Sequence, residues 1–112
     1  MTSQPLPNDP REIKNDRPNR RKIEQIMEIE WGSSILTSSV RDIGPKGLFV
    51  ELTPPLWLGA TFSARLMLNP PIQLICTVCR VEPSTGMGVT FSMQEEDGIA
   101  RLEKLLATLP KI

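Results

Sequence analysis

The most regular pattern in the chain is the alternation of apolar and polar residues between Ile23 and Trp31. The odd-numbered positions of this segment are mostly apolar, whereas the even-numbered positions are glutamates apart from Ile26. A period of two residues is typical of a β-strand with one buried face and one solvated face. The pattern therefore predicts a first strand that begins near Lys22.

Further short apolar segments follow, and turn-forming residues separate them. The segments rich in Val, Ile, Leu, Phe and Thr are 35–43, 48–52, 60–68, 72–81 and 87–93. Prolines fall between the segments, as expected because proline cannot donate a hydrogen bond to a sheet. Gly44-Pro45-Lys46-Gly47 predicts a hairpin between the second and third strands. Six short strands of this kind predict a barrel or a sandwich.

The last segment has a helical period. Its apolar residues recur at helical spacing and form one stripe, Ile99, Leu102, Leu106 and Leu109. The sequence Ser92-Met93-Gln94-Glu95 matches a capping box, and Pro110 marks the end of the helix. We expect a helix over about 94–109 that covers an open end or side of the barrel. Leu105 lies off the stripe and would be available to a partner.

Residues 1–16 carry three prolines and no periodic apolar pattern, which predicts a flexible N-terminal tail. Residues 17–112 then form a single domain, in keeping with a chain of 112 residues. No apolar segment is long enough to cross a bilayer, and the N-terminus does not resemble a secretion signal. We therefore expect a cytoplasmic protein without membrane insertion.

The charge of the chain is balanced overall but unevenly distributed. The formal net charge is zero, which argues against a protein that binds nucleic-acid polymers. Between Arg11 and Lys22, however, six basic residues stand against two acidic ones. Basic charge that gathers beside one end of a neutral domain predicts a localised anion site. The alternative is that this run is only a solvated tail.

The cysteines and aromatic residues favour packing over chemistry. Cys76 and Cys79 form one C-x-x-C within a predicted strand, and no histidine or third cysteine could complete a metal site. We expect a buried thiol and an unrelated neighbour, with no metal and no cofactor. No nucleophile accompanied by a base is evident, so no enzymatic activity is expected. The five aromatic residues, Trp31, Phe49, Trp57, Phe62 and Phe91, are expected to pack in the core or at the barrel rim.

Two short motifs flank the first two strands. Arg17-Pro18-Asn19-Arg20-Arg21 is an R-x-x-x-R, and Asp42-Ile43-Gly44-Pro45-Lys46-Gly47 follows at the hairpin. In this order the motifs resemble the PilZ family, whose pattern is R-x-x-x-R and then [D/N]-x-S-x-x-G. The resemblance covers residues 17–108 and includes Cys-Arg-Val at 79–81 and Gly-Met-Gly-Val-Thr-Phe at 86–91. It implies a six-stranded antiparallel, split β-barrel with a C-terminal helix.

The resemblance also implies a ligand, the bacterial second messenger cyclic di-GMP. Arg17 and Arg21 would take the two arginine roles, since a guanidinium fork matches both a phosphate and the O6/N7 edge of guanine. Asp42 would accept from the N1–H and N2–H₂ donors of guanine, and Gly44 and Gly47 would shape the turn. Gly47 suits a place that needs positive φ or close approach of the ligand.

Two further cations, Arg20 and Lys46, lie beside the motifs but off the motif positions. We expect them to be additional phosphate contacts.

The chain departs from the family pattern at Gly44, where the family has serine. Loss of one neutral hydrogen bond costs about 0.5–1.5 kcal/mol, which weakens binding roughly two- to tenfold. Asp16, directly before the first arginine, adds a negative charge near the expected phosphates. Two functions stay open: a cyclic di-GMP receptor that signals to a protein partner, and a degenerate domain that serves only as a protein-interaction adaptor in motility or pilus assembly.

Overall fold

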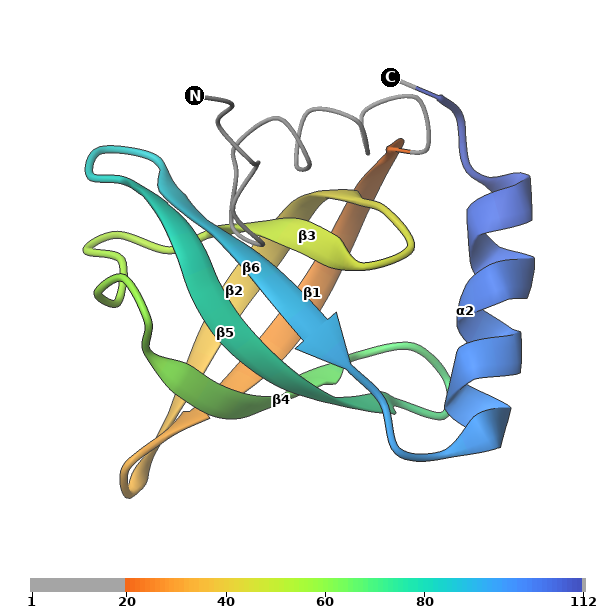
Figure 1. Ribbon diagram of the computed structural model, residues 1–112, viewed down its shortest axis with the longest axis horizontal. Coiled ribbons are helices and arrows are strands. Elements are labelled where there is room, and N and C mark those ends of the chain that lie inside the picture. The colour runs from red at the N-terminus through yellow and green to blue at the C-terminus, as the bar shows by residue number, and fades with distance from the viewer. Residues whose placement is uncertain (1–19, 112) are drawn as a thin grey trace, which may run out of the picture.

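The computed structural model describes residues 20–111, and in this part of the chain six strands form a closed antiparallel barrel. The elements are β1 (Arg21–Trp31), β2 (Ser34–Ile43), β3 (Gly47–Glu51), β4 (Thr61–Leu66), β5 (Ile72–Glu82), β6 (Gly86–Ser92) and α2 (Glu96–Thr108). Around the barrel the order is β1-β2-β3-β6-β5-β4, and pairing of β1 with β4 closes it (Figure 1). The predicted fold class is confirmed. The predicted tail over 1–16 lies outside the described residues.

The alternation of apolar and polar residues correctly predicted which side chains of β1 face the barrel interior and which face solvent. Ile23, Met27 and Ile29 are buried in the barrel interior, where they join apolar side chains from the other strands. Ile26, the apolar residue on the polar face, is 47% exposed. The interior is therefore filled by side chains from alternate positions of each strand, as expected for a small barrel.

Three strands depart from a regular ladder near one corner of the barrel. In β2, Val40 pairs with Val50 and Asp42 pairs with Phe49, so Arg41 is an extra residue. In β5 the pairing shifts in the same way between Val78 and Arg80, and in β1 it shifts between Lys22 and Gln25. Such bulges change which side chains face outward and are frequent next to functional sites.

Helix α2 stands beside the barrel, and the chain after it returns to the start of β1 (Figure 1). The Lys22 amide donates to the Pro110 carbonyl at 2.9 Å, and Lys111 bridges to Arg21. The C-terminal end of the helix is thereby tied to the strand that leads out of the arginine motif.

The expected capping box is not formed. Ser92 pairs with Ile75 as the last residue of β6, so it is unable to cap a helix. The helix begins later, with Glu95 at the N-cap and without a side-chain cap hydrogen bond. Glu96 and Asp97 in the first turn interact favourably with the helix dipole.

The face of α2 that packs on the barrel differs from the predicted stripe. Gly98 and Leu102 are buried, and Leu105, Leu106 and Leu109 are partly covered, whereas Ile99 is 42% exposed. A Cβ atom on Gly98 would lie 3.5 Å from Ile72 and 3.6 Å from Met93. Gly98 thus lies on the face that packs on the barrel, and this face extends toward Leu105 and away from Ile99.

One tryptophan is also exposed where packing was expected. Trp57 is 64% exposed, as is Leu58, because a tight turn between the Trp57 carbonyl and the Ala60 amide (3.0 Å) projects both side chains outward. Trp31 meets the Trp57 ring edge-on, with ring centroids 4.9 Å apart. No helix among residues 20–111 has the length and apolar character needed to cross a membrane.

Candidate functional site

Arg20, Asp42 and Gly47 meet at the corner where β1 starts and β2 turns into β3. The Arg20 Nε donates to Asp42 Oδ1 at 3.1 Å, and its Nη2 pairs with the same oxygen. Its Nη1 donates to the Gly47 carbonyl at 3.2 Å. The side chains of Arg20 and Asp42 are only 18% and 14% exposed. The guanidinium therefore links the expected ligand carboxylate to the hairpin, and we call these three residues the corner cluster.

The two neighbouring arginines of the motif are placed differently. Arg21 is the register partner of Ile43, a fully buried core residue, so its side chain leaves the strand on the inner side. Its Nε is buried and has no hydrogen-bond partner among the described residues. Spacing assigned the motif position to Arg21, whereas the structure brings Arg20 to Asp42. Arg17 lies outside the described residues.

The hairpin contains Gly44, Lys46 and Gly47. The Gly44 amide donates to the Gly47 carbonyl at 2.8 Å, as expected for a tight turn. Neither glycine has positive φ. Gly47 is required for a different reason, since a Cβ atom there would lie 2.6 Å from the Val89 carbonyl oxygen of β6. Lys46 is exposed, and its carbonyl accepts from the Phe91 amide at 3.0 Å.

A row of register partners crosses five strands beside the corner cluster. Lys22 pairs with Asp42, Asp42 with Phe49, Phe49 with Gly88, and Gly88 with Arg80. Phe49 faces outward, because its neighbours Leu48 and Val50 both lie in the barrel core. We call these five residues, Lys22, Asp42, Phe49, Gly88 and Arg80, the outer row.

Arg41 and Arg80 belong to this face and were not singled out from the sequence. The guanidinium carbon of Arg41 lies 3.9 Å from the centroid of the Phe49 ring, and Arg41 Nε lies 3.4 Å from Asp42 Oδ2. The guanidinium carbon of Arg80 is 5.7 Å from the same ring centroid. The bulges bring both arginines to the outer face together with Asp42.

A signal for these bulges is present in the sequence. In β5 the buried positions are Leu74, Cys76 and Val78, all even, and the next apolar residue is Val81, which is odd. In β2 the buried positions move from Val40 to Ile43. A change of phase within an alternating strand indicates an inserted residue.

The two cysteines lie on opposite sides of the barrel wall, as expected. Cys76 is fully buried, and burial raises the pKa of its thiol to about 12. Cys79 is the extra residue of the β5 bulge, and its thiol donates to the Gly88 carbonyl at 3.4 Å. Burial raises the pKa of Cys79, while the charges of Arg80 and Arg20 oppose this rise. Residues 20–111 contain no group of side chains suited to a metal ion.

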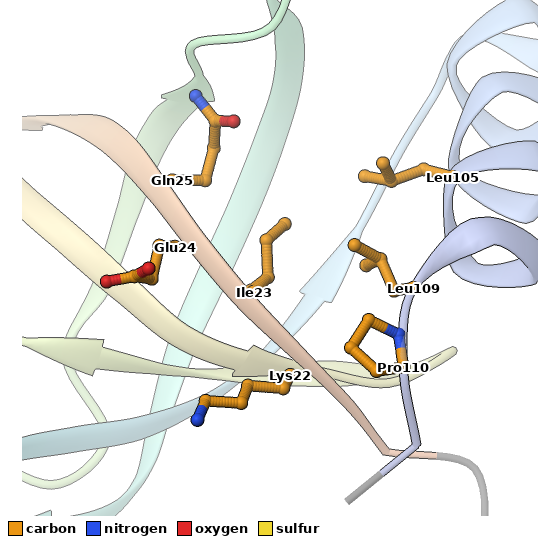
Figure 2. A pocket seen from close by; sticks show the side chains of 7 residues that line it. All are labelled: Lys22, Ile23, Glu24, Gln25, Leu105, Leu109 and Pro110. Carbon is orange, nitrogen blue, oxygen red and sulfur yellow. The ribbon is translucent and has the colours of Figure 1, made fainter.

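Two grooves border β1. The larger, of about 350 Å³, lies between β1 and the end of α2, where Ile23 faces Leu105 and Leu109 (Figure 2). The smaller, of about 220 Å³, reaches from Lys22 to Arg41. Lys22 of the outer row lines both grooves, and no residue of the corner cluster lines either one. The larger groove is mostly apolar, whereas the smaller one also includes Arg41, which contacts Asp42. Charge and hydrogen-bonding capacity thus favour the face around Asp42 as the candidate site.

Comparison with known families agrees with this geometry. The family model for the PilZ domain matches residues 15–108, which includes both motifs, the whole barrel and α2. No curated protein matches the chain in sequence. With most of its length matched by that model, and with the six-stranded barrel and C-terminal helix in place, the chain belongs to the PilZ domain family.

Proposed function

We propose that this domain is a receptor for cyclic di-GMP and that the ligand binds at the corner cluster and the outer row. PilZ domains are in general binding modules for this dinucleotide and not enzymes. The observation that carries the proposal is the half-buried Asp42 carboxylate, which faces outward among Arg20, Arg41 and Lys22. One acceptor and several cations on one face suit a ligand with donor edges and two phosphates.

The Arg20–Asp42 pair supports one specific way of holding a guanine. A guanidinium presents two adjacent N–H donors to Asp42, and the N1–H and N2–H₂ edge of guanine presents a similar pair. Guanine would replace Arg20 at the carboxylate, and the released guanidinium would bind a phosphate. Asp42 would then accept hydrogen bonds from the neutral base and keep Arg41 as its cationic neighbour at 3.4 Å, and Arg20 would gain a phosphate as its partner.

This exchange gives a route to signalling. Arg20 precedes β1 directly, and Lys22 at the start of β1 is hydrogen-bonded to Pro110 after α2. A ligand that moves Arg20 would reorder the segment leading into β1, including Arg17, and create a surface that a protein partner reads. Ordering of a segment by a charged ligand is an established kind of switch.

Calorimetric titration with cyclic di-GMP tests the proposal. Removing a charge-assisted contact costs about 1.5–3 kcal/mol, so Asp42→Ala and Arg17→Ala are each expected to weaken binding roughly ten- to hundredfold. Arg65→Ala, which removes an arginine paired with Glu28 on another part of the wall, is the matched control and should bind normally. Absence of heat with the folded wild-type protein would end the proposal.

Arg20→Ala and Arg21→Ala together decide which arginine acts with Arg17. Geometry favours Arg20, because Arg20 contacts Asp42, while motif spacing favours Arg21. The variant with the larger loss of affinity identifies the binding residue. Equal heats for wild type and both variants would exclude Arg20 and Arg21 from binding.

The second candidate function is a protein-interaction adaptor that binds no nucleotide. Gly44 favours it, because the hydroxyl of the family serine is missing there. The exposed side chains of Trp57 and Leu58 also favour it, since rigid apolar residues are common contacts in protein interfaces. A wild-type protein that gives no heat, together with a Gly44→Ser variant that gives heat, would show that Gly44 removes nucleotide binding, as the adaptor function requires. Capture of a protein partner that is indifferent to added cyclic di-GMP would support the adaptor function itself.

A further inference from the structure

Phe49 is an unusual aromatic residue, because it is fully buried although it faces away from the barrel core. Among its covering groups is the guanidinium of Arg41, whose carbon lies 3.9 Å from the ring centroid, and Arg80 approaches to 5.7 Å. Both distances fall within the range of cation–π contacts. The Phe49 ring on the outer side of the barrel is thus partly covered by the guanidinium groups of Arg41 and Arg80.

The backbone holds both arginines in this place. Arg41 is the inserted residue of the β2 bulge, and the bulge in β5 brings Arg80 to the outer face. Gly88 lies between Phe49 and Arg80 in the outer row, where a Cβ atom would come within 3.5 Å of Arg80 Cβ and 3.6 Å of its Nε. Arg80 therefore lies against Gly88 of β6 on the side that leads toward the ring.

The arginines remain accessible from outside. Their side chains are 44% and 46% exposed, although each also has a carboxylate neighbour, Asp42 Oδ2 at 3.4 Å from Arg41 and Glu82 Oε2 at 3.5 Å from Arg80. A guanidinium plane with one face on an aromatic ring can stack a nucleobase on its other face. Lysine has no such plane, so this arrangement depends on arginine.

We propose that Arg41 and Arg80, supported by Phe49, form a stacking seat for one guanine of cyclic di-GMP. The inference rests on the proposed function and adds to it the residues that hold the flat face of the base. Asp42 neighbours Phe49 in the outer row, so a base on this seat presents its edge to the Asp42 carboxylate. The same guanine is read on its edge by Asp42 and on its face by the two arginines.

Charge-conserving substitutions test the seat. Arg41→Lys and Arg80→Lys keep the positive charge and remove the plane, and each is expected to weaken cyclic di-GMP binding about five- to tenfold, the low end of base-stacking effects. Arg65→Lys is the control, since Arg65 is exposed to a similar degree but lies beside Glu28 on β1 and β4. Circular dichroism confirms that each variant is folded before titration.

A spectroscopic measurement separates stacking from charge. In the wild-type protein the Nε–H resonances of Arg41 and Arg80 should move upfield when cyclic di-GMP is added, because they enter the shielding region of a base, while that of Arg65 should not move.

If Arg41→Lys and Arg80→Lys bind cyclic di-GMP with unchanged affinity while Asp42→Ala binds it more weakly, the stacking proposal is wrong and the proposed function stands. An equal loss in Arg65→Lys would also overturn the stacking proposal. A wild-type protein that does not bind cyclic di-GMP would overturn both.

Discussion

Two of the arginine–carboxylate pairs in the barrel wall differ in their surroundings. Arg65 and Glu28 are register partners in the regular ladder of β1 and β4, with Nη2 and Oε1 2.8 Å apart and side chains 40% and 31% exposed. Arg20 and Asp42 meet at the corner cluster, where the side chains are 18% and 14% exposed and Arg20 also donates to a backbone carbonyl. The first pair is a surface ion pair, and the second is half-buried and tied to a turn.

This difference shows where burial restricts which residues the fold can accept. An exposed pair in a regular ladder is screened by solvent, and its net contribution to stability is about 0–1 kcal/mol. At the corner cluster the backbone approaches closely, the strands are bulged, and each charge needs its partner because water reaches it poorly. Such a mostly buried charged cluster is consistent with the ligand site that we propose at the corner cluster.

The largest expected effect comes from adding a single methyl group at the corner. Gly47→Ala would place a Cβ atom 2.6 Å from the Val89 carbonyl oxygen, where backbone must move on both sides. We expect a loss of about 3 kcal/mol in the free energy of unfolding, the upper end of overpacking costs, which thermal denaturation would show as a fall in Tm of roughly 15 °C.

Gly98→Ala is the matched control for this change. Its Cβ would meet Ile72 and Met93 at ordinary contact distances of 3.5 and 3.6 Å within a helix, so a gain of up to about 1 kcal/mol is expected. An unchanged Tm in Gly47→Ala would show that β3 and β6 leave room for a side chain at Gly47.

The second effect compares the two ion pairs directly. Asp42→Ala leaves a half-buried guanidinium without its carboxylate and should cost about 1.5–3 kcal/mol. Glu28→Ala breaks an exposed pair and should cost no more than about 1 kcal/mol. Urea denaturation of both variants, with Arg20→Ala and Arg65→Ala to complete two double-mutant cycles, measures the coupling energies. Equal coupling energies in the two cycles would show that burial does not distinguish the two ion pairs.

The third effect concerns the turn itself. Gly44→Ser restores the hydroxyl of the family pattern at a residue whose φ is not positive, so the backbone should tolerate a side chain. We expect cyclic di-GMP to bind roughly two- to tenfold more tightly, in line with one neutral hydrogen bond. Titration calorimetry measures the change, and weaker binding by a folded variant would show that Gly44 is adapted to this site.

The smallest effect uses the cysteines as reporters of the two sides of the wall. At pH 8 an alkylating reagent should modify Cys79 and spare Cys76, because burial holds the pKa of the Cys76 thiol at about 12 and the side chain is inaccessible. Arg80→Gln should slow the reaction at Cys79 modestly, since loss of that cation raises the pKa of Cys79 and lowers its thiolate fraction. Mass spectrometry of the labelled protein gives both rates, and unaltered labelling in Arg80→Gln would place Arg80 away from the thiol.

Much of the fold could be predicted from local pattern. The alternation in β1, the proline boundaries and the Gly44–Gly47 turn all act within a few residues, so the sequence reveals them directly. The helix was predicted in the correct region, and Leu102, Leu106 and Leu109 of the predicted stripe pack on the barrel, whereas Ile99 does not and Leu105 does. This shift of the packing face depends on contacts such as that of Gly98 with Ile72, which are far apart in the chain.

The candidate site was predictable only in part. The motifs pointed to Asp42 and to the basic run before β1, and the structure places Asp42 on the outer wall with an arginine from that run. Spacing could not choose between Arg20 and Arg21, because the choice depends on where the strand begins and which way each side chain leaves it. Arg41 and Arg80 were missed because bulges bring them to the outer face.

By itself the sequence determined the strand segments, the turns and the two motifs, since each depends on the periodicity and conformational preferences of neighbouring residues. Only the tertiary structure decided which charges share one face, because that depends on register across five strands and on three bulges. A shift of one residue in any of these ladders would turn Asp42, Phe49 or Arg80 to the opposite side of the wall.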